Sequence, residues 1–206
     1  MLCSPVVLIA QHNNIHFEHI SAKLGQLHNP VEYILQDHLG FLWIASETGL
    51  FQYDGYRIKE FGHDIYDTTS LSSPTIWHIA EDAQGRILVA TTYGINLFDR
   101  HSGTFERLIP FPAESSTKEQ NTIRWLHLDH DQRLWVAGYH NLFLFDEQSR
   151  SFHEIHDRSG ADKDHVVRTM AESPDGTLWC GTNTGLLRIL PGDTVFTVWL
   201  PVETTK

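Results

Sequence analysis

The sequence predicts an all-β protein, a β-propeller of about four blades with four strands each. One pattern occurs four times along the 206 residues, at intervals of 45, 47 and 44 residues. Repeats of this length occur in helical arrays and in propellers. Each copy consists of short β-prone runs between glycine and polar residues, and none contains an amphipathic run of about 10–12 residues at helical spacing. Strand blades are therefore favoured over helix pairs.

The repeated pattern has two anchor positions, and the second follows the first by nine residues in every copy. Glycine occupies most of these positions. The first anchors are Gly40, Gly85, Gln132 and Gly176, and the second anchors are Gly49, Gly94, Asn141 and Gly185. A spacing that is kept in all copies indicates one structural unit repeated along the chain.

Four short strands are expected in the first copy, over residues 31–36, 41–46, 50–53 and 56–61. Turn residues such as Asp and Gly separate them. Four antiparallel strands in a repeat of this length form one propeller blade. We expect a partial propeller over residues 15–206, with repeats near 31–74, 75–121, 122–164 and 165–200.

The anchor residues also predict backbone conformations. The first-anchor glycines of copies one, two and four are expected to supply a positive φ in the hairpin between the first two strands. Gln132 follows Asp131 in the third copy, which predicts a different turn there. Asn141 replaces a second-anchor glycine, and asparagine tolerates the left-handed conformation that we expect at this position.

The apolar residue at the centre of each first run is expected to be buried. Trp43, Trp135 and Trp179, with Leu88 in the second copy, are predicted to pack between adjacent blades. Cys180 takes the place of Ile or Val in the other copies and is interpreted as a small buried hydrophobic residue. Two cysteines are too few for a disulfide scaffold.

The charge balance excludes some classes of partner. Asp and Glu outnumber Lys and Arg by 26 to 15, a net charge of −11, which disfavours nucleic acid and anionic membranes as partners. No apolar stretch approaches the roughly 20 residues of a membrane span, so no direct insertion is expected. Residues 2–10 are apolar and precede a polar stretch, so residues 1–14 are either a signal-peptide remnant or an N-terminal tail.

Neither a metal site nor a cofactor site is predicted. The histidines considered as ligands are His12, His16 and His19, the pair His127 and His130, and the pair His153 and His156. In strands, each group is split between two faces. The chain also lacks a His-Glu-x-x-His motif and a cluster of Cys and His. These histidines are interpreted as solvated loop residues.

No catalytic site is predicted either. Asp54, Asp99 and Asp146 recur at one repeat position, where a ring of carboxylates is conceivable. Each follows a strand, so capping of a turn explains them better. Ser72, His78 and Asp82 match no known arrangement of a catalytic nucleophile, and no Gly-x-Ser-x-Gly elbow occurs.

The first two copies carry a family resemblance. The segments Phe17-Glu18-His19-Ile20, Gly25-Gln26-Leu27, Ile34-Leu35-Gln36-Asp37, Gly40-Phe41-Leu42-Trp43-Ile44-Ala45, Gly49-Leu50 and Tyr53-Asp54-Gly55 resemble the start of the two-component regulator propeller family. The resemblance continues through Asp67, Ser70-Leu71-Ser72, Ile76 and Ile79-Ala80-Glu81-Asp82 and covers about residues 17–198. The departures are Leu88 for Trp, Gln132 for Gly, and Ala45-Ser46, Ala90 and Ala137-Gly138 near the usual Gly-Thr.

This resemblance implies a fragment of a receptor. The family's propellers are extracytoplasmic sensor regions of bacterial hybrid histidine kinases and of some diguanylate cyclases. Those regions look like two consecutive seven-bladed rings, followed by a β-sandwich, a membrane helix and an output domain. About four blades of one seven-bladed ring are therefore expected here, without the kinase or cyclase; a truncated reading frame and a complete four-bladed unit stay open as alternatives. The uncovered blade faces would favour self-association of the receptor.

The implied function is ligand sensing in the periplasm, as part of an inner-membrane protein, without catalysis. A cytoplasmic location follows if residues 1–14 are not a signal remnant. The expected ligand is a periplasmic small molecule or an oligosaccharide. The candidate contacts are the aromatic residues outside the repeated Trp position: Tyr56, Tyr66, Trp77, Tyr93, Trp125 and Tyr139. A protein-interaction scaffold stays open as the alternative, and a propeller lyase or hydrolase is less favoured.

Overall fold

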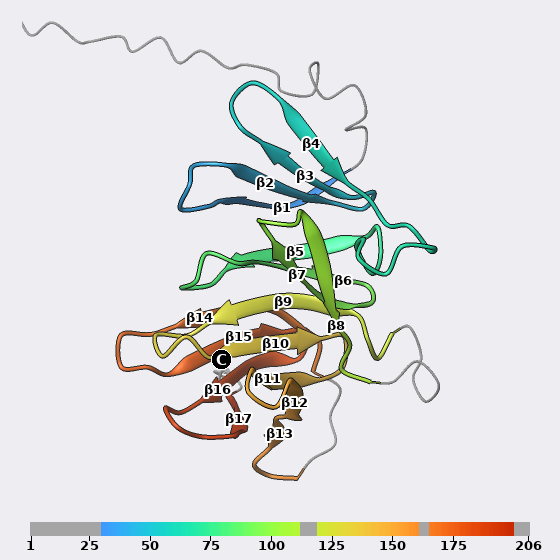
Figure 1. The fold of residues 1–206 in the computed structure, drawn as a ribbon. Helices are drawn as coiled ribbons and strands as arrows, with labels where there is room; N and C mark the ends of the chain where they lie inside the picture. Colours follow the sequence, from blue (N-terminus) through green and yellow to red (C-terminus); the bar gives the residue numbers. More distant parts are fainter. Residues whose placement is uncertain (1–29, 112–118, 161–164, 200–206) are drawn as a thin grey trace, which may run out of the picture.

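The computed structural model describes residues 30–111, 119–160 and 165–199 (Figure 1). These residues form strands and turns without a helix, so none of them builds a helix that could cross a membrane. The all-β class is confirmed. The leader or tail expected at residues 1–14 lies outside the described residues.

The strands form four sheets that follow one another along the chain (Figure 1). The first sheet holds β1 (Val31–Gln36), β2 (Leu42–Ser46), β3 (Leu50–Tyr53) and β4 (Ile58–Phe61), and the second holds β5 (Ile76–Glu81), β6 (Ile87–Thr91), β7 (Gly94–Asp99) and β8 (Thr104–Leu108). The third holds β9 (Ile123–Leu128), β10 (Leu134–Gly138), β11 (Leu142–Asp146) and β12 (Ser151–Glu154). The fourth holds β13 (His156–Asp157), β14 (Val167–Glu172), β15 (Leu178–Thr182), β16 (Gly185–Ile189) and β17 (Val195–Trp199).

Each sheet is an antiparallel meander, as expected for a propeller blade. The fourth sheet departs from the expected four strands, because the short β13 pairs with β17 in parallel and adds a fifth. The first strands of the blades, β1, β5, β9 and β14, contact one another in series. We call them the inner strands, and their series of contacts sets the blades side by side.

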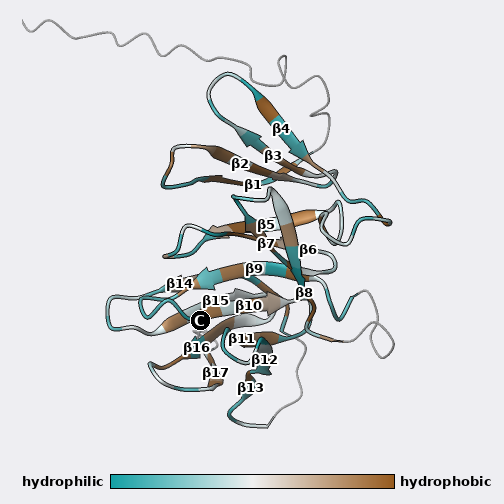
Figure 2. Cartoon of the chain, viewed as in Figure 1, coloured by the Kyte–Doolittle hydropathy of each residue, from teal (hydrophilic) through white to brown (hydrophobic). Residues whose placement is uncertain are grey.

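Trp43 and Trp135 pack between blades, as predicted, whereas the prediction was wrong for Trp179. Trp43 is fully buried against the second blade, with its ring 5.2 Å from that of Phe98. Leu88 and Trp135 occupy the same position between the next pairs of blades. Trp179 is only half-buried and lies beside Trp199 at the side of the fourth blade that faces no other described blade. Apolar residues concentrate in the strands and polar residues in the turns (Figure 2).

Two expectations about the anchors were wrong. Gln132 has a φ of 63° and its amide donates to the Asp129 carbonyl at 2.8 Å, as Gly40 does to Asp37 at 2.9 Å. The third copy therefore makes the same turn, because its hydrogen bonds offset the strain of a side chain there. Asn141 does not adopt a positive φ. In the third copy the glycine of this turn is Gly138 instead. A Cβ added to Gly138 would lie 3.2 Å from the Asn141 carbonyl oxygen.

Candidate functional site

The turns between the first and second strands are built around an aspartate. Asp37 Oδ1 accepts the amides of Leu39 and Phe41 at 3.0 and 2.9 Å, and its Oδ2 accepts the Trp43 indole N–H at 2.8 Å. Asp129 repeats this arrangement with the Trp135 indole at 2.9 Å. Burial opposes ionisation, but these hydrogen bonds hold the pKa of both carboxyls below the ordinary value.

The other two copies keep the same turn with different partners. Asp82 Oδ2 accepts the Nε–H of Arg86 at 2.6 Å, as Asp129 Oδ2 accepts that of Arg133 at 2.7 Å, but Leu88 adds no indole donor. In the fourth copy Ser173 Oγ accepts the Trp179 indole at 3.2 Å. The sequence interpretation named Asp37 and Asp82 without assigning them this role, and it did not single out Asp129 or Ser173. An Asp or Ser six positions before each Trp or Leu was the signal that could have found them.

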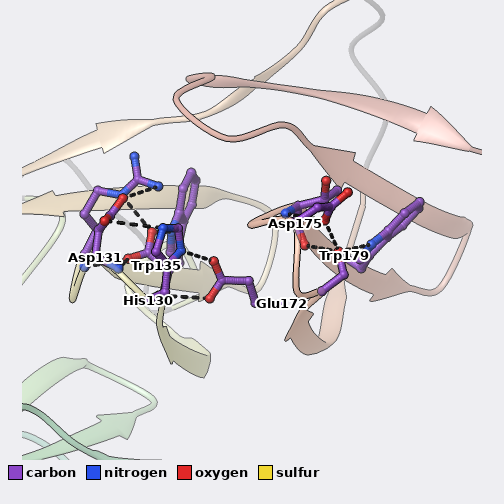
Figure 3. Close-up of polar contacts among 10 residues, drawn as sticks. His130, Asp131, Trp135, Glu172, Asp175 and Trp179 are labelled. Carbon is purple, nitrogen blue, oxygen red and sulfur yellow. Dashed lines mark hydrogen bonds and ion pairs between the residues drawn. The ribbon is translucent and has the colours of Figure 1, made fainter.

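Ion pairs also join neighbouring blades at this end, which we call the turn end. His130 Nδ1 lies 2.5 Å from Glu172 Oε1, and the His130 amide donates to Glu172 Oε2 at 2.9 Å (Figure 3). His38 and Glu81 make the equivalent pair between the first two blades. The hydrogen bond to Glu172 raises the pKa of His130. The polar groups of these turns are thus used by the fold itself.

The inner strands present a different arrangement, an unbroken stack of rings. The His78 ring lies 4.0 Å from the Tyr33 ring and 4.0 Å from the Trp125 ring. The three residues come from three blades, and each stands opposite an alanine of the adjacent strand. Those alanines are Ala45, Ala90 and Ala137. These small side chains leave room for the rings that stand opposite them.

His78 is unusual because it is buried without a hydrogen bond. Its exposed fraction is 4%, and neither ring nitrogen has a partner among the described residues. Burial, with a smaller effect of His127, lowers the pKa of His78 to about 3, so the ring is neutral. His127 Nε2 is also buried and unpaired, and burial lowers its pKa despite Glu172 and Asp129. A buried polar atom without a partner costs roughly 1–3 kcal/mol, so such atoms call for an explanation.

A hollow of about 300 Å³ opens onto this stack. Its lining includes Tyr33, Leu35, His78, Trp125, His127 and Met170. Neutral imidazole both donates and accepts hydrogen bonds, and the rings offer apolar faces. Apolar walls with a few polar groups are typical of small-molecule sites. We take these residues, the inner-strand site, as the candidate functional site.

The aromatic residues considered from sequence fall into separate places. Trp125 belongs to the inner-strand site, and Trp77 and Tyr139 lie beside it around Arg124. Tyr56 and Tyr66 are 89% and 95% exposed and make no ring contact with the others. Tyr93 is half-buried in a loop of the second blade. Tyr33, which completes the stack, was not singled out, because the position holds a different residue type in each copy.

The groups weighed for catalysis take structural roles. The carboxylates of Asp54, Asp99 and Asp146 accept backbone amides of the turns that follow them, as interpreted from sequence. Ser72 bonds with Thr91 and Asn96 rather than with His78 or Asp82. Cys180 is fully buried, which raises its pKa to about 12.

The histidines weighed as metal ligands are spread over the molecule. His153 and His156 lie on β12 and β13, His127 lies at the inner-strand site and His130 at the turn end. Among the residues that the structure describes, no group of three His, Cys, Asp or Glu side chains is placed to hold a metal ion. His12, His16 and His19 lie outside these residues.

Solved structures share the propeller architecture. The extracellular domain of a one-component system, BT4673 from B. thetaiotaomicron, matches with a TM-score of 0.66 and 22% identity over 83% of this chain and 22% of that one. Virginiamycin B lyase from Staphylococcus aureus, an inactive variant with quinupristin, matches with a TM-score of 0.65 and 16% identity over 88% and 58%. The chain thus spans less than two thirds of either structure. These likenesses establish propeller blades.

The family comparison is more specific. Residues 70–93 and 162–184 match the model of the two-component regulator propeller family. A second structure of a BT4673 extracellular domain, described as a hybrid two-component system, matches with a TM-score of 0.54 and 19% identity over 88% of this chain and 34% of that one. No curated protein matches the chain. Residues 70–93 and 162–184 thus carry two-component regulator propeller repeats, and the solved structures show that the propeller fold is shared.

Proposed function

We propose that this chain is a ligand-sensing propeller region of a bacterial two-component or cyclic-di-GMP signalling receptor, located in the periplasm. It acts by binding and not by catalysis. The observation that carries the proposal is the buried, unpaired His78 between two aromatic rings on a hollow of about 300 Å³. The repeats of residues 70–93 and 162–184 support the receptor class.

The site can couple binding to the arrangement of the blades. Its stack takes one ring from each of β1, β5 and β9. A ligand that bonds to His78 and covers Tyr33 and Trp125 therefore favours one relative placement of three blades. Such differential binding shifts a receptor between states, which is how a sensor region acts on an output domain.

The ligand proposed is a periplasmic small molecule or an oligosaccharide. Sugar rings have apolar faces that lie on aromatic side chains and hydroxyls that both donate and accept. The neutral imidazole of His78 can donate a hydrogen bond to a hydroxyl or accept one from it. Such a bond gives a partner to a ring nitrogen that the fold leaves unpaired. This hydrogen bond removes the free-energy cost of a buried nitrogen without a partner, so it adds to the affinity of the ligand without any new charge.

Calorimetric titration of the full chain with a panel of periplasmic oligosaccharides tests this function. Trp125→Ala is expected to weaken binding by tenfold or more, and Trp125→Phe to retain part of it. Tyr66→Ala is the matched control, because Tyr66 is 95% exposed and outside the hollow. Binding that is equally strong in Trp125→Ala would place the ligand elsewhere. Absence of binding across the panel, with capture of a protein partner through the blade surfaces, would favour an interaction scaffold instead.

We also propose receptor self-association through the apolar side chains at the two outer blades. Ile34 on β1 is 57% exposed, and Trp199 on β17 is 55% exposed. Removing such surfaces from water favours association by roughly 25 cal/mol per Å². Sedimentation of the full chain at physiological salt tests this, and a concentration-independent monomer would contradict it.

A further inference from the structure

Each inner strand carries a β-bulge near its start. The register with the second strand slips between Val31 and Tyr33, between Ile76 and His78, and at the equivalent places of β9 and β14. One unpaired residue is therefore inserted per strand: Glu32, Trp77, Arg124 and Arg168. Bulges re-aim a side chain and are common beside binding sites. These four residues form one level of the molecule, at the opposite end of the inner strands from the turn end.

Arg124 is held between aromatic rings at this level. Its Cζ lies 4.1 Å from the ring centre of Trp77 and 5.5 Å from that of Tyr139. Its Nε is buried without a partner, as is the indole nitrogen of Trp77. The terminal Nη atoms are not buried, and they have no partner among the described residues. The rings thus fix a guanidinium group whose donors stay available.

Unpaired arginines are notable in a chain with a net charge of −11. Five of the ten arginines of the described residues pair with an Asp or Glu, namely Arg86, Arg100, Arg133, Arg150 and Arg158, whereas Arg57, Arg107 and Arg188 do not. Arg124 makes no such pair within the part of the chain that the structure describes. Arg168, which is exposed, makes none there either and occupies the equivalent position on the neighbouring strand β14. Glu32 is the acidic residue among the four bulge residues. It lies on β1, and β5 stands between β1 and the strand β9 that carries Arg124.

We propose that Arg124 and Arg168 form an anion subsite that binds the carboxylate of a ring-shaped acidic ligand, such as a uronic acid. A guanidinium group pairs with a carboxylate through two parallel hydrogen bonds, and stacking keeps its plane fixed. Arg124 is followed directly by Trp125 of the inner-strand site, so one ligand can place its carboxylate at the bulge level and its ring at the stack. The inference deepens the proposed function and rests on it.

Titration of the isotope-labelled full chain with glucuronate, followed by NMR, tests the subsite. Glucose is the control ligand with the same ring and no charge, and acetate is the control ligand with a carboxylate and no ring. Glucuronate is expected to shift the Trp77 indole N–H signal and to bind at least tenfold more tightly than glucose or acetate. Arg168→Gln and Arg124→Gln are each expected to weaken glucuronate binding about tenfold, the scale of one charge-assisted hydrogen bond. Arg124→Lys keeps the positive charge but lacks the two parallel donors of a guanidinium group. It is expected to retain only part of the wild-type affinity for glucuronate.

Arg57→Gln is the matched control, because Arg57 is an exposed arginine of the first blade, outside the inner strands. Since Arg168 is exposed, its substitution leaves the fold intact and keeps the test valid if Arg124 variants misfold. Equal weakening by all three glutamine variants would show general charge attraction and overturn the subsite, as would equal affinity for glucose and glucuronate or no binding of glucuronate. Binding of neutral oligosaccharides is measured separately, so the proposed function can survive the loss of this subsite.

Discussion

The two ends of the inner strands use similar residues in opposite ways. At the turn end, His130 pairs with Glu172, and Asp129 receives two backbone amides and an indole. At the inner-strand site, His78 is buried between two rings with both nitrogens unpaired, and Arg124 nearby pairs with no carboxylate of the described residues. Groups that the fold uses for its own stability are satisfied within it. Groups left unpaired at a cost in stability are the ones available to a ligand.

The largest expected effect comes from the interface between the third and fourth blades. Trp135 is 2% exposed and packs against Met170 and Leu178. Trp135→Ala is expected to lower the free energy of unfolding by about 3–5 kcal/mol, the range for removing a large aromatic side chain from a core. Urea denaturation followed by circular dichroism measures it. Trp199→Ala, at an exposed position, should cost less than about 1 kcal/mol. Similar losses from both variants would contradict a tight inter-blade core.

Removal of one turn aspartate should have the next largest effect. Asp129→Ala leaves the amides of Asp131 and Arg133 and the Trp135 indole without their acceptor. The free energy of unfolding is expected to fall by about 2–3 kcal/mol, the scale of unpaired buried donors. The adjacent, exposed Asp131→Ala is the control and should change it by about 0.5 kcal/mol or less. Equal effects would mean that the carboxylate of Asp129 is dispensable for the turn.

The same aspartates predict a loss of stability in acid. The pKa of Asp129 is lower in the folded chain than its ordinary value near 3.8, so the carboxylate stabilises the fold above that pH and the gain is lost as pH falls through the folded pKa. Asp129→Ala should flatten the acid limb of stability against pH. An unchanged acid limb would show that other carboxylates govern acid unfolding.

At the inner-strand site the opposite result is expected. His78→Phe replaces an unpaired imidazole by a ring of similar shape and should raise the free energy of unfolding by about 1 kcal/mol at pH 7. The wild type should lose stability as pH falls from about 6.5 toward 3, because only the unfolded chain takes up the proton when the folded pKa is about 3. The variant should lack that slope. A destabilised variant at pH 7 would indicate that His78 is a structural residue.

The fold could be predicted because its determinants are local and repeated. Spacing of the anchors and the turn glycines placed the strands of the first blade within a residue or two. Gln132 and Asn141 were misjudged because hydrogen bonds around a turn can override the preference of one residue. The inner-strand site could not be predicted in the same way. Tyr33, His78 and Trp125 differ in type and meet only when three blades stand side by side, so no repeated pattern marks them.

The smallest expected effect concerns the ion pair of the turn end, and its pH dependence has the opposite sign to that of His78. Hydrogen bonding to Glu172, with Asp131 and Asp129 nearby, raises the pKa of His130. A raised folded pKa stabilises the fold fully below the unfolded value near 6.5, and this contribution is lost as pH rises through the folded pKa. His130→Gln should therefore lower the midpoint of urea unfolding at pH 5.5 and leave it unchanged at pH 9. Because the pair is exposed to solvent, the shift should also shrink in high salt.

Glu172→Gln should produce a similar loss at pH 5.5, and the double variant should cost less than the sum of the two single ones. Additive losses at pH 5.5, or a loss that persists at pH 9, would show that the two side chains hold their blades by packing, and that the charge between them is irrelevant to the turn end.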